Sequence, residues 1–295
     1  MDILITGHSG YIGSVLTNKL SRDNNVILFE GDVSQKSNWE NNLSTSIDII
    51  YHLAAVEPSN PFRPDWGHTR IDKEWQVNSY SVIHIHEICA KKNISPKIVF
   101  VSSTNVFGCV DTKIVDEKTT EDVAAFWSLH KLLGEKYLRI LNKMYGTKFT
   151  VLMLPNVYGP SSTIELTDRM TLNKVINQAV TSNELELYDN KMCLRDCLYI
   201  DDAINAFELM LHLPDSYFNG DRFLLGSDKK ITIESFWKEI AQQVPSTTIK
   251  YNNKKLTPYD YRNYTSDISK FNRVTNWYPK VSLTQGISNT IGVYK

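Results

Sequence analysis

The stretch MDILITGHSGYIG, residues 1–13, decides the fold of this chain. Ile3, Leu4 and Ile5 form an apolar run that is long enough for one buried strand. Three glycines follow at a spacing of three residues: Gly7, Gly10 and Gly13. Apolar side chains then recur at helical spacing over residues 15–20. The order strand, glycine turn, helix is typical of a site where bare backbone and a helix N-terminus approach a diphosphate.

A glycine triplet also has a second interpretation, a tight turn that closes a helix onto a sheet without any ligand. The strand–turn–helix context favours the nucleotide interpretation. We therefore assign the three glycines to a dinucleotide site, together with Tyr11 and Ile12 at the start of the helix. The turn also contains His8, which we expect to face solvent.

The second predicted strand covers residues 26–29 and ends at Glu30, about twenty residues past the glycines. A carboxylate there can accept hydrogen bonds from an adenosine ribose diol and would repel a 2′-phosphate, so NAD(H) is favoured over NADP(H). A polar residue that merely caps the strand is the alternative. Asp32 and Val33 follow at once and are assigned to the same nucleotide site. A short helix over 37–43 leaves little room for a third strand, and this compression keeps NADP(H) open.

Three further apolar runs are predicted as buried strands: residues 47–53, 97–101 and 149–154. The first ends at Leu53 and leads into Ala54 and Ala55, whose small side chains would let a cofactor lie close over the strand end, so all three residues are assigned to the cofactor site. The second is followed by Ser102–Asn105 and the third by Pro155–Pro160. Ligands of parallel α/β sheets bind at the carboxyl ends of the strands, so these clusters predict the site.

Helical patterns over 69–92 and 121–145 alternate with these strands, which are apolar on both faces. The fold class is therefore α/β, a Rossmann-type doubly wound parallel sheet. After residue 160 shorter elements predict a smaller, mixed α/β substrate lid. They are helices over 167–181, 203–213 and 231–244, strands over 185–188 and 223–225, and a last helix from about 283. The predicted domains are 1–160 with 192–228 for the dinucleotide and 161–191 with 229–295 for the substrate.

The composition excludes several classes of function. The chain has 295 residues and a formal net charge of −1, so no basic excess points to nucleic acid or to an anionic membrane surface. No apolar run approaches the length of a membrane span. The chain begins directly with a strand, and we expect a cytoplasmic protein without a signal peptide. The four cysteines form no CxxC pair and predict free buried thiols rather than a metal site.

A series of motifs along the whole chain resembles the extended short-chain dehydrogenase/reductases, the NAD-dependent epimerase/dehydratase family, whose members modify nucleotide sugars. The matching segments are ITGHSGYIGS at 5–14, HLAA at 52–55, Asn78, VFVSSTNVFG at 99–108, Lys131 with Glu135, NVYGP at 156–160, RDCLYIDD at 195–202, DISK at 267–270 and NWYPKVSL at 276–283. Each segment alone is only moderately specific for this family. Their occurrence together, in the same order along the chain, is specific for it.

The resemblance implies a nicotinamide dinucleotide on the sheet and a nucleotide sugar under the lid. It implies that Ser103 bonds the sugar oxygen that changes oxidation state, with Thr104 beside it, and that Lys131 holds the nicotinamide ribose. It also assigns Asn78, Pro155 and Val157 to the cofactor site. The substrate residues that it implies are Asn156, Arg169, Arg195 and Arg262, with Arg195 on the diphosphate. It further implies a homodimer formed through the helices at about 70–92 and 121–145.

The sequence departs from the family at the residue that moves the proton. The family has a tyrosine four residues before the lysine, and here that residue is Trp127. An indole N–H only donates hydrogen bonds and cannot accept a hydroxyl proton. Two family arginines are also replaced, by Met153 and Thr257, and Arg262 is one of the cations that could compensate.

Without the tyrosine, oxidation of an alcohol lacks its base, whereas reduction of a ketone needs only hydrogen-bond donors and then a proton. The sequence therefore predicts an NAD(P)H-dependent reductase of a keto group on a nucleotide-activated sugar. Ser103, Thr104 and the Trp127 N–H are the expected donors, and Lys131, His130 or water the proton source. One alternative is an epimerase with a base relocated to His130. Another is a catalytically silent, dinucleotide-binding regulatory subunit.

Overall fold

The computed structural model describes residues 1–56 and 71–295, which divide into two compact units. Unit 1 comprises Met1–Val106, Val123–Met153 and Glu208–Phe223. Unit 2 comprises Phe107–Asp122, Leu154–Phe207 and Leu224–Lys295. The units interleave more finely than the predicted domains, because residues 107–122, 154–160, 192–207 and 224–228 join unit 2. The assignment of a cofactor to one part and a substrate to the other stays a prediction.

Unit 1 is built on a six-stranded sheet in the order β10-β6-β4-β3-β1-β2. Its strands are β1 (Asp2–Thr6), β2 (Asn25–Leu28), β3 (Ile49–His52), β4 (Lys97–Ser103), β6 (Phe149–Leu154) and β10 (Asn219–Leu224). The neighbours β2, β1, β3 and β4 all run parallel. The order proceeds outward from β1 in both directions, which confirms the predicted doubly wound sheet. Between β2 and β3, where every residue is described, the chain forms only helix α2 (Lys36–Asn42), so β2 is an edge strand.

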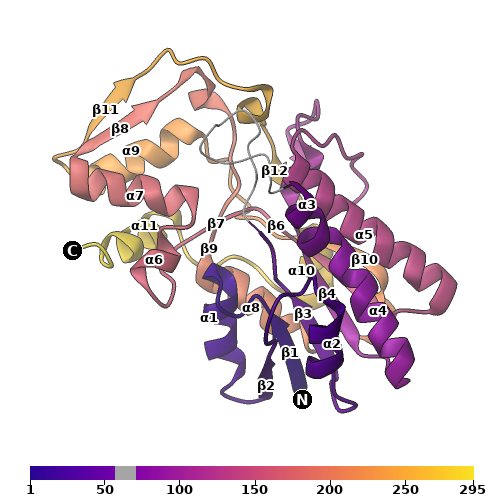
Figure 1. Cartoon of the computed structure of the whole chain (residues 1–295). Coiled ribbons are helices and arrows are strands. Elements are labelled where there is room, and N and C mark those ends of the chain that lie inside the picture. Colours follow the sequence, from indigo (N-terminus) through magenta and orange to yellow (C-terminus); the bar gives the residue numbers. More distant parts are fainter. Residues whose placement is uncertain (57–70) are drawn as a thin grey trace. The chain divides into compact units, whose positions relative to one another are not determined.

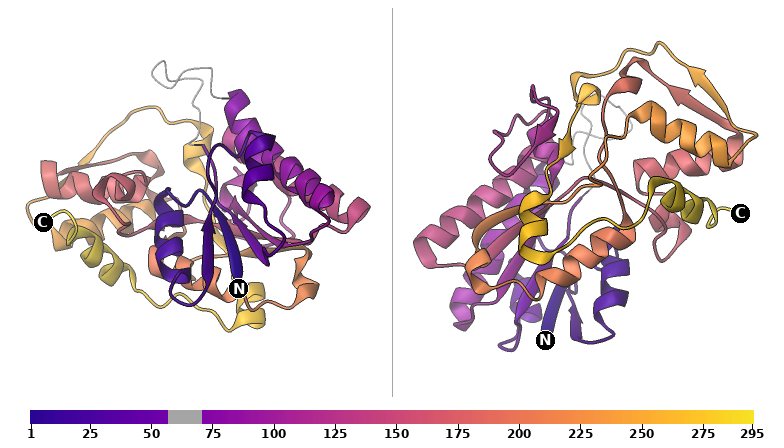
Figure 2. Two further views of the ribbon diagram at one scale, coloured as in Figure 1. Left: turned by 60° about the horizontal axis from the view of Figure 1, so that its bottom comes forward. Right: turned by 180° about the vertical axis from the view of Figure 1, so that it is seen from behind.

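Helices cover both faces of this sheet. Helix α1 (Tyr11–Leu20) lies on one side, and α2, α4 (Ser81–Lys92) and α5 (Phe126–Tyr145) lie on the other (Figure 1). Figure 2 shows the same division, with the indigo α1 and the purple α4 on opposite sides of the strands. This is the arrangement that right-handed crossovers produce when strands are added on both sides of β1.

The core of unit 1 consists of the strands themselves. The residues of β3 and β6 are buried along their whole length, as expected for parallel strands with helices on both faces. Trp39 of α2 is fully buried, and its Nε1 donates to the Val33 carbonyl at 2.7 Å. Its ring packs against Phe29 with centroids 4.4 Å apart. These contacts pack the short segment after β2 against the edge of the sheet, where no additional strand forms.

Unit 2 contains three small parallel two-stranded sheets: β5 (Ile114–Val115) with β12 (Thr265–Ser266), β7 (Asn156–Tyr158) with β9 (Cys197–Tyr199), and β8 (Glu184–Leu187) with β11 (Thr248–Tyr251). Its helices are α6 (Ile164–Thr167), α7 (Thr171–Ser182), α9 (Ile233–Gln243), α10 (Ser269–Thr275) and α11 (Leu283–Ile291), and α8 (Ile200–Met210) begins in it. The Asp202 carboxylate accepts from the N–H groups of Lys280 and Val281 at 2.9 and 3.0 Å. This contact ties the C-terminal segment to the start of α8.

Several predicted element boundaries are wrong. The helix predicted over 121–145 begins at Phe126, because Ala125 has extended backbone angles (φ −151°, ψ 148°). The helix predicted over 167–181 is split into α6 and α7, since Met170 is extended (φ −89°, ψ 134°). The helix predicted over 69–92 consists of α3 (Ile71–Trp75), a π-helical turn η3 (Gln76–Tyr80) and α4, and residues 69 and 70 lie outside the described ranges.

Two further differences concern residues near the site and one cysteine. Ser102 and Ser103 belong to β4 rather than to the loop after it, and the 3₁₀ turn η4 (Thr104–Phe107) follows directly.

All four cysteines are free, but only Cys89 and Cys197 are buried. Cys109 is exposed, because it follows η4 in a surface loop, where its Sγ donates to the Pro258 carbonyl at 3.3 Å. Among the described residues, no helix is both long and apolar enough to cross a membrane.

Candidate active site

The glycine turn brings α1 and the end of β3 into close contact with β1. Gly7 has φ +71°, and a Cβ atom there would lie 2.7 Å from the Ala54 nitrogen. A Cβ on Gly13 would collide with the Gly7 carbonyl, and the Gly10 N–H donates to that same carbonyl at 2.9 Å. Side chains are therefore excluded at Gly7 by conformation and at Gly13 by space.

The N-terminus of α1 fits a diphosphate. The helix begins at Tyr11 with Gly10 as its N-cap, without a capping side chain and without an acidic residue in its first turn. Its first amides are thus left for an anion, which the helix dipole also favours. His8 is half-buried rather than solvent-facing as predicted, and its buried Nδ1 has no hydrogen-bond partner among the described residues. Tyr11 is buried and Ile12 half-buried behind the turn.

At the end of β2, the backbone of Glu30 is fixed while its carboxylate is not. The Glu30 N–H donates to Asn42 Oδ1 at 2.7 Å, and Asn42 Nδ2 donates to the Glu30 carbonyl at 2.9 Å. Glu30 is exposed, and in the described part of the chain its carboxylate forms no hydrogen bond or ion pair. It is therefore available to a ribose diol.

The next two predicted cofactor residues already have partners in the protein. Asp32 forms an ion pair with Lys73 of α3 and accepts from the Ser34 N–H at 2.9 Å. Val33 is buried, with its carbonyl held by Trp39. Sequence reasoning missed Lys73, because nothing in the local pattern indicates a partner 41 residues away.

The segment after β3 is held by side chains from two other elements. His52 is fully buried, with Nδ1 bonded to Thr6 Oγ1 and Nε2 to Ser81 Oγ, each at 2.8 Å. The Ala54 N–H donates to Thr6 Oγ1 at 3.1 Å, which fixes the course of Leu53–Ala55. Burial, assisted by the charge of Lys131, lowers the pKa of His52 to about 3, so its imidazole is neutral.

The peptide of Val56 is bound by Asn78 and Trp127. Asn78 is fully buried on the π-helical turn η3, and its Oδ1 accepts from the Val56 N–H at 3.0 Å. Trp127, on the first turn of α5, donates its Nε1 hydrogen to the Val56 carbonyl at 3.0 Å. An indole has one N–H. The expected use of this N–H as a donor to a substrate oxygen is therefore corrected, because Val56 already accepts it.

The two hydroxyl residues at the end of β4 are buried at the carboxyl edge of the sheet. Ser103 is 7% exposed and Thr104 4% exposed. Ser103 Oγ accepts from the Asn105 N–H at 3.2 Å, which orients the side chain at the start of η4.

Lys131 is buried with its charged end against β4. Its Nζ donates to the Val101 carbonyl at 3.0 Å and lies 5.3 Å from the Phe100 ring centroid and 6.0 Å from that of Trp127. Only 3% of the residue is exposed. Burial lowers the pKa of Lys131 to about 8, and the charge of Glu135 opposes the shift.

A buried ion pair that sequence reasoning missed lies one turn along α5. Glu135 accepts from Ser102 Oγ through one oxygen and from Arg222 Nε of β10 at 2.9 Å through the other. Glu135 and Arg222 are both buried. Glu135 belongs to the motifs noted in the sequence, but Arg222 carries no local signal.

A second buried pair joins α3 and α5. His130 Nδ1 lies 3.3 Å from Glu74 Oε2, and the two residues are 5% and 0% exposed. His130 therefore lies inside the protein and is oriented by a carboxylate.

The predicted substrate residues lie in unit 2, and most of their polar groups bond to the backbone there. Asn156 Nδ2 donates to the Asp196 carbonyl at 3.0 Å. The guanidinium of Arg195 donates to the carbonyls of Leu194 (2.9 Å), Asp260 (2.6 Å) and Arg262. In this arrangement Arg195 holds the 260–262 turn rather than presenting a free fork to a diphosphate.

The other residues of unit 2 that were predicted to bind substrate or cofactor differ in how exposed they are. Arg262 lies over the Tyr259 ring, 3.3 Å from its centroid, and donates to the Tyr259 carbonyl at 2.8 Å. Arg169 is exposed, and the described residues give its side chain no partner. Pro155 and Val157 are buried at the start of β7.

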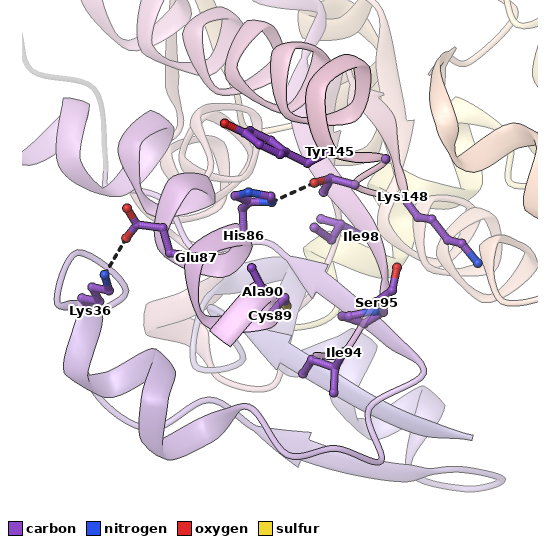
Figure 3. A pocket seen from close by; sticks show the side chains of 13 residues that line it. Lys36, His86, Glu87, Cys89, Ala90, Ile94, Ser95, Ile98, Tyr145 and Lys148 are labelled. Carbon is purple, nitrogen blue, oxygen red and sulfur yellow. Dashed lines mark hydrogen bonds and ion pairs between the residues drawn. The ribbon is translucent and has the colours of Figure 1, made fainter. Parts of the chain in front are cut away.

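A cavity of about 560 Å³ lies elsewhere in unit 1. Figure 3 shows it beside the C-terminal ends of α4 and α5, where His86 bonds Thr147 Oγ1 at 2.9 Å and packs against the Tyr145 ring. Its lining includes Ile98, at the opposite end of β4 from Ser103 and roughly 17 Å away along the strand. None of the predicted site residues lines it.

Comparisons with known proteins agree with this fold. An uncharacterised UDP-glucose epimerase of Bacillus subtilis is 25% identical over 322 residues, covering 99% of this chain and 97% of the relative. A UDP-glucose 4-epimerase from Thermotoga maritima, solved with UDP-glucose, superimposes with a TM-score of 0.85 at 22% identity, covering 100% and 98% of the two chains. A UDP-glucuronic acid 4-epimerase from Bacillus cereus, solved with NAD, gives a TM-score of 0.79 at 21% identity, covering 100% and 96%.

The model of one protein family matches residues 3–226, from β1 through β10. This span includes the glycine turn, the hydroxyl residues at the end of β4 and the buried lysine of α5. The chain belongs to the NAD dependent epimerase/dehydratase family.

Proposed function

We propose that the protein is an NAD(P)H-dependent reductase of a keto group on a nucleotide-activated sugar. The observation that carries this proposal is the hydrogen bond from Trp127 Nε1 to the Val56 carbonyl at 3.0 Å. The residue four before Lys131 is thus neither an acid nor a base, and its only polar hydrogen is used within the protein. A site of this kind lacks the tyrosine that would take a proton from an alcohol.

Reduction places smaller demands on the site. A bound nicotinamide dinucleotide supplies the hydride, and the protein must stabilise the oxygen that becomes negatively charged. The buried hydroxyls of Ser103 and Thr104 are suited to this task, since they lie at the carboxyl edge of the parallel sheet. Because the Trp127 N–H already donates to the Val56 carbonyl, these two hydroxyls are the predicted donors that remain for the substrate oxygen.

The cofactor proposed is NAD(H), with NADP(H) as the alternative. The glycine turn and the uncapped start of α1 would hold the diphosphate, and Asn78 would fix the backbone next to the nicotinamide. The carboxylate of Glu30, which has no partner among residues 1–56 and 71–295, supports NAD(H), because it can accept from a ribose diol and would repel a 2′-phosphate.

The substrate proposed is a nucleotide sugar, which the names of the relatives support: they are described as UDP-glucose and UDP-glucuronic acid epimerases. Arg169 and Arg262 are the cations of unit 2 proposed to meet its phosphates, and Asn156 is proposed to bond nearby. Arg195 would act through the 260–262 turn that it holds.

The experiment is a reduction assay with purified protein, NADH or NADPH, and a panel of nucleotide 4-keto- and 3-keto-sugars, including uridine, thymidine and guanosine forms. Stoichiometric oxidation of the reduced dinucleotide with one substrate supports the proposal. Failure across the whole panel, with dinucleotide binding demonstrated separately by calorimetry, contradicts it and favours the silent regulatory subunit.

An epimerase with a relocated base is a second candidate, favoured by the buried His130–Glu74 pair. A carboxylate that orients an imidazole makes it a better base. Epimerisation returns the hydride to the sugar, so it converts one nucleotide sugar into another without net change of the dinucleotide. Interconversion of this kind, abolished in His130→Gln and retained in the control His212→Gln, would favour this candidate.

We also propose that the protein forms a homodimer through α4 and α5. Phe126, Ile140 and Met144 are 43%, 52% and 64% exposed, and their spacing of 14 and 18 residues places them on one face of α5. An exposed apolar stripe of this length suits a self-complementary contact between two copies. Light scattering should give a dimer for the wild type and a monomer for Ile140→Asp/Met144→Asp, whereas a wild-type monomer would contradict the proposal.

A further inference from the structure

We propose that Lys131 is the proton donor of the reduction, so that its buried ammonium takes over the step for which Trp127 has no titratable group. This inference rests on the proposed reductase function. It assigns Lys131 a direct chemical task in addition to holding the cofactor.

The position of the ammonium supports this role. Lys131 Nζ donates one hydrogen to the Val101 carbonyl at 3.0 Å. Val101 lies two residues before Ser103 on β4, so both residues direct their side chains to the same face of the sheet and lie about 7 Å apart along the strand. An ammonium has three hydrogens, so Lys131 retains donors for an oxygen bound at Ser103.

The surroundings of the ammonium favour release of a proton. The ring centroids of Phe100 and Trp127 lie 5.3 and 6.0 Å from Nζ, and only 3% of the residue is exposed. No carboxylate lies within ion-pair distance of Nζ among the described residues. Burial without a contacting anion disfavours the charged form of an amine, in agreement with the lowered pKa of Lys131.

Charged groups on four packed elements set how strongly the proton is held. On α5 itself, Glu135 favours the ammonium, but Arg222 of β10 binds one oxygen of that carboxylate and offsets its charge. On β3, His52 is neutral and adds no charge. Between α3 and α5, Glu74 and His130 bond to each other.

The reaction balances with this donor. The carbonyl carbon accepts a hydride, two electrons and one proton, from the reduced nicotinamide dinucleotide. The carbonyl oxygen takes a proton from the Lys131 ammonium, so C=O becomes CH–OH and Lys131 becomes a neutral amine. A proton from water then restores the ammonium. The net change is ketone, reduced dinucleotide and one proton to alcohol and oxidised dinucleotide.

The first readout does not depend on turnover. Protein labelled with ¹³C at the lysine ε-carbons, in complex with oxidised dinucleotide, is titrated by NMR, and the Lys131 signal is assigned by its loss in Lys131→Arg. We expect its midpoint near pH 8, below the usual range of a lysine side chain. Glu135→Gln should lower the Lys131 midpoint further, since it removes the charge that favours the ammonium.

The second readout is the pH dependence of reduction. The wild-type kcat should fall about tenfold per pH unit above the measured Lys131 midpoint, because the donor is then deprotonated. Lys131→Arg keeps a cation that does not release its proton, so dinucleotide affinity should stay within about threefold while kcat falls about 100-fold or more and loses this pH dependence. The control Lys143→Arg should match the wild type.

Two outcomes overturn the role of Lys131 while leaving the reductase proposal intact. One is a Lys131→Arg variant that reduces the substrate at the wild-type rate with the wild-type pH profile. The other is a wild-type profile whose midpoint differs by more than one pH unit from that of the Lys131 signal. Absence of turnover in the wild type across the keto-sugar panel instead overturns the reductase proposal, and the inference with it.

Discussion

At the scale of single residues, the site contains a buried serine and a buried lysine together with a tryptophan that cannot titrate. Ser103 is buried at the end of β4, and Lys131 is buried on α5. Trp127 has no titratable group, and its Nε1 donates to the backbone carbonyl of Val56. An indole in this position can hold a peptide in place but cannot move a proton.

Trp127→Tyr tests this exchange directly. A phenol close to the Lys131 ammonium would provide a second acid, and general acids contribute about 10²–10⁴-fold to rate. We expect kcat for reduction to rise about tenfold or more, because Lys131 already supplies part of that effect. The measurement is steady-state kinetics with saturating dinucleotide, with Trp127→Phe as the control that lacks both donors. A tyrosine variant no faster than the phenylalanine variant would show that proton delivery does not limit the rate.

Glu30 determines the expected choice between the two dinucleotides. Its carboxylate is free of protein partners in the described part of the chain, and bonds to a charged acceptor contribute about 1.5–3 kcal/mol. Glu30→Ala should therefore weaken NADH binding about tenfold or more and improve NADPH binding, as measured by calorimetry. Equal affinities of the wild type and the variant for both dinucleotides would remove Glu30 from the ribose site.

At the scale of elements, two buried networks hold the sheet and helices of unit 1 together. His52 joins β3 to Thr6 of β1 and to Ser81 of α4. Arg222 joins β10 to Glu135 of α5. Both networks pair residues far apart in the chain, such as Glu135 and Arg222, which are 87 positions apart. Periodicity and motif spacing reveal which helix and strand exist, but not which polar groups meet when they pack.

The Arg222–Glu135 pair predicts a characteristic mutational pattern. Removal of one partner leaves a buried charge uncompensated, so Arg222→Met should lower the free energy of unfolding by about 3–5 kcal/mol. The double variant Arg222→Met/Glu135→Leu should recover much of that loss, because both charges are then gone. Urea denaturation of the two single variants and the double variant measures this cycle. Additive losses would mean that the pair is not coupled.

The neutral imidazole of His52 predicts how stability depends on pH. Its pKa is about 3 in the folded protein and about 6.5 when unfolded, so below pH 6.5 the unfolded state binds more protons. The contribution of His52 is complete above pH 6.5 and is lost progressively toward pH 3, at about 1.4 kcal/mol per pH unit. Between pH 6.5 and 5 it should account for about 2 kcal/mol, measured by urea denaturation. A His52→Asn variant should show a flatter dependence, and a slope equal to that of the wild type would contradict this assignment.

At the scale of the whole molecule, the fold could be predicted because its signals are local. The apolar strands, the glycine turn and the alternation with helices establish a doubly wound sheet, and the family match over residues 3–226 agrees. Three features could not be predicted, because each depends on contacts made only after folding. They are the π-helical turn that presents Asn78, the strand β7, and the hydrogen bonds of the Arg195 guanidinium to backbone carbonyls.

The central claim is net reduction, and its most direct test follows a deuterium atom. The protein is incubated with NADH or NADPH deuterated on the transferable C4 position and with a nucleotide keto-sugar, and the products are analysed by mass spectrometry. We predict one deuterium in each molecule of nucleotide sugar alcohol, with an equal amount of oxidised dinucleotide. Turnover of the nucleotide sugar without net oxidation of the dinucleotide and without label in the product would contradict the claim.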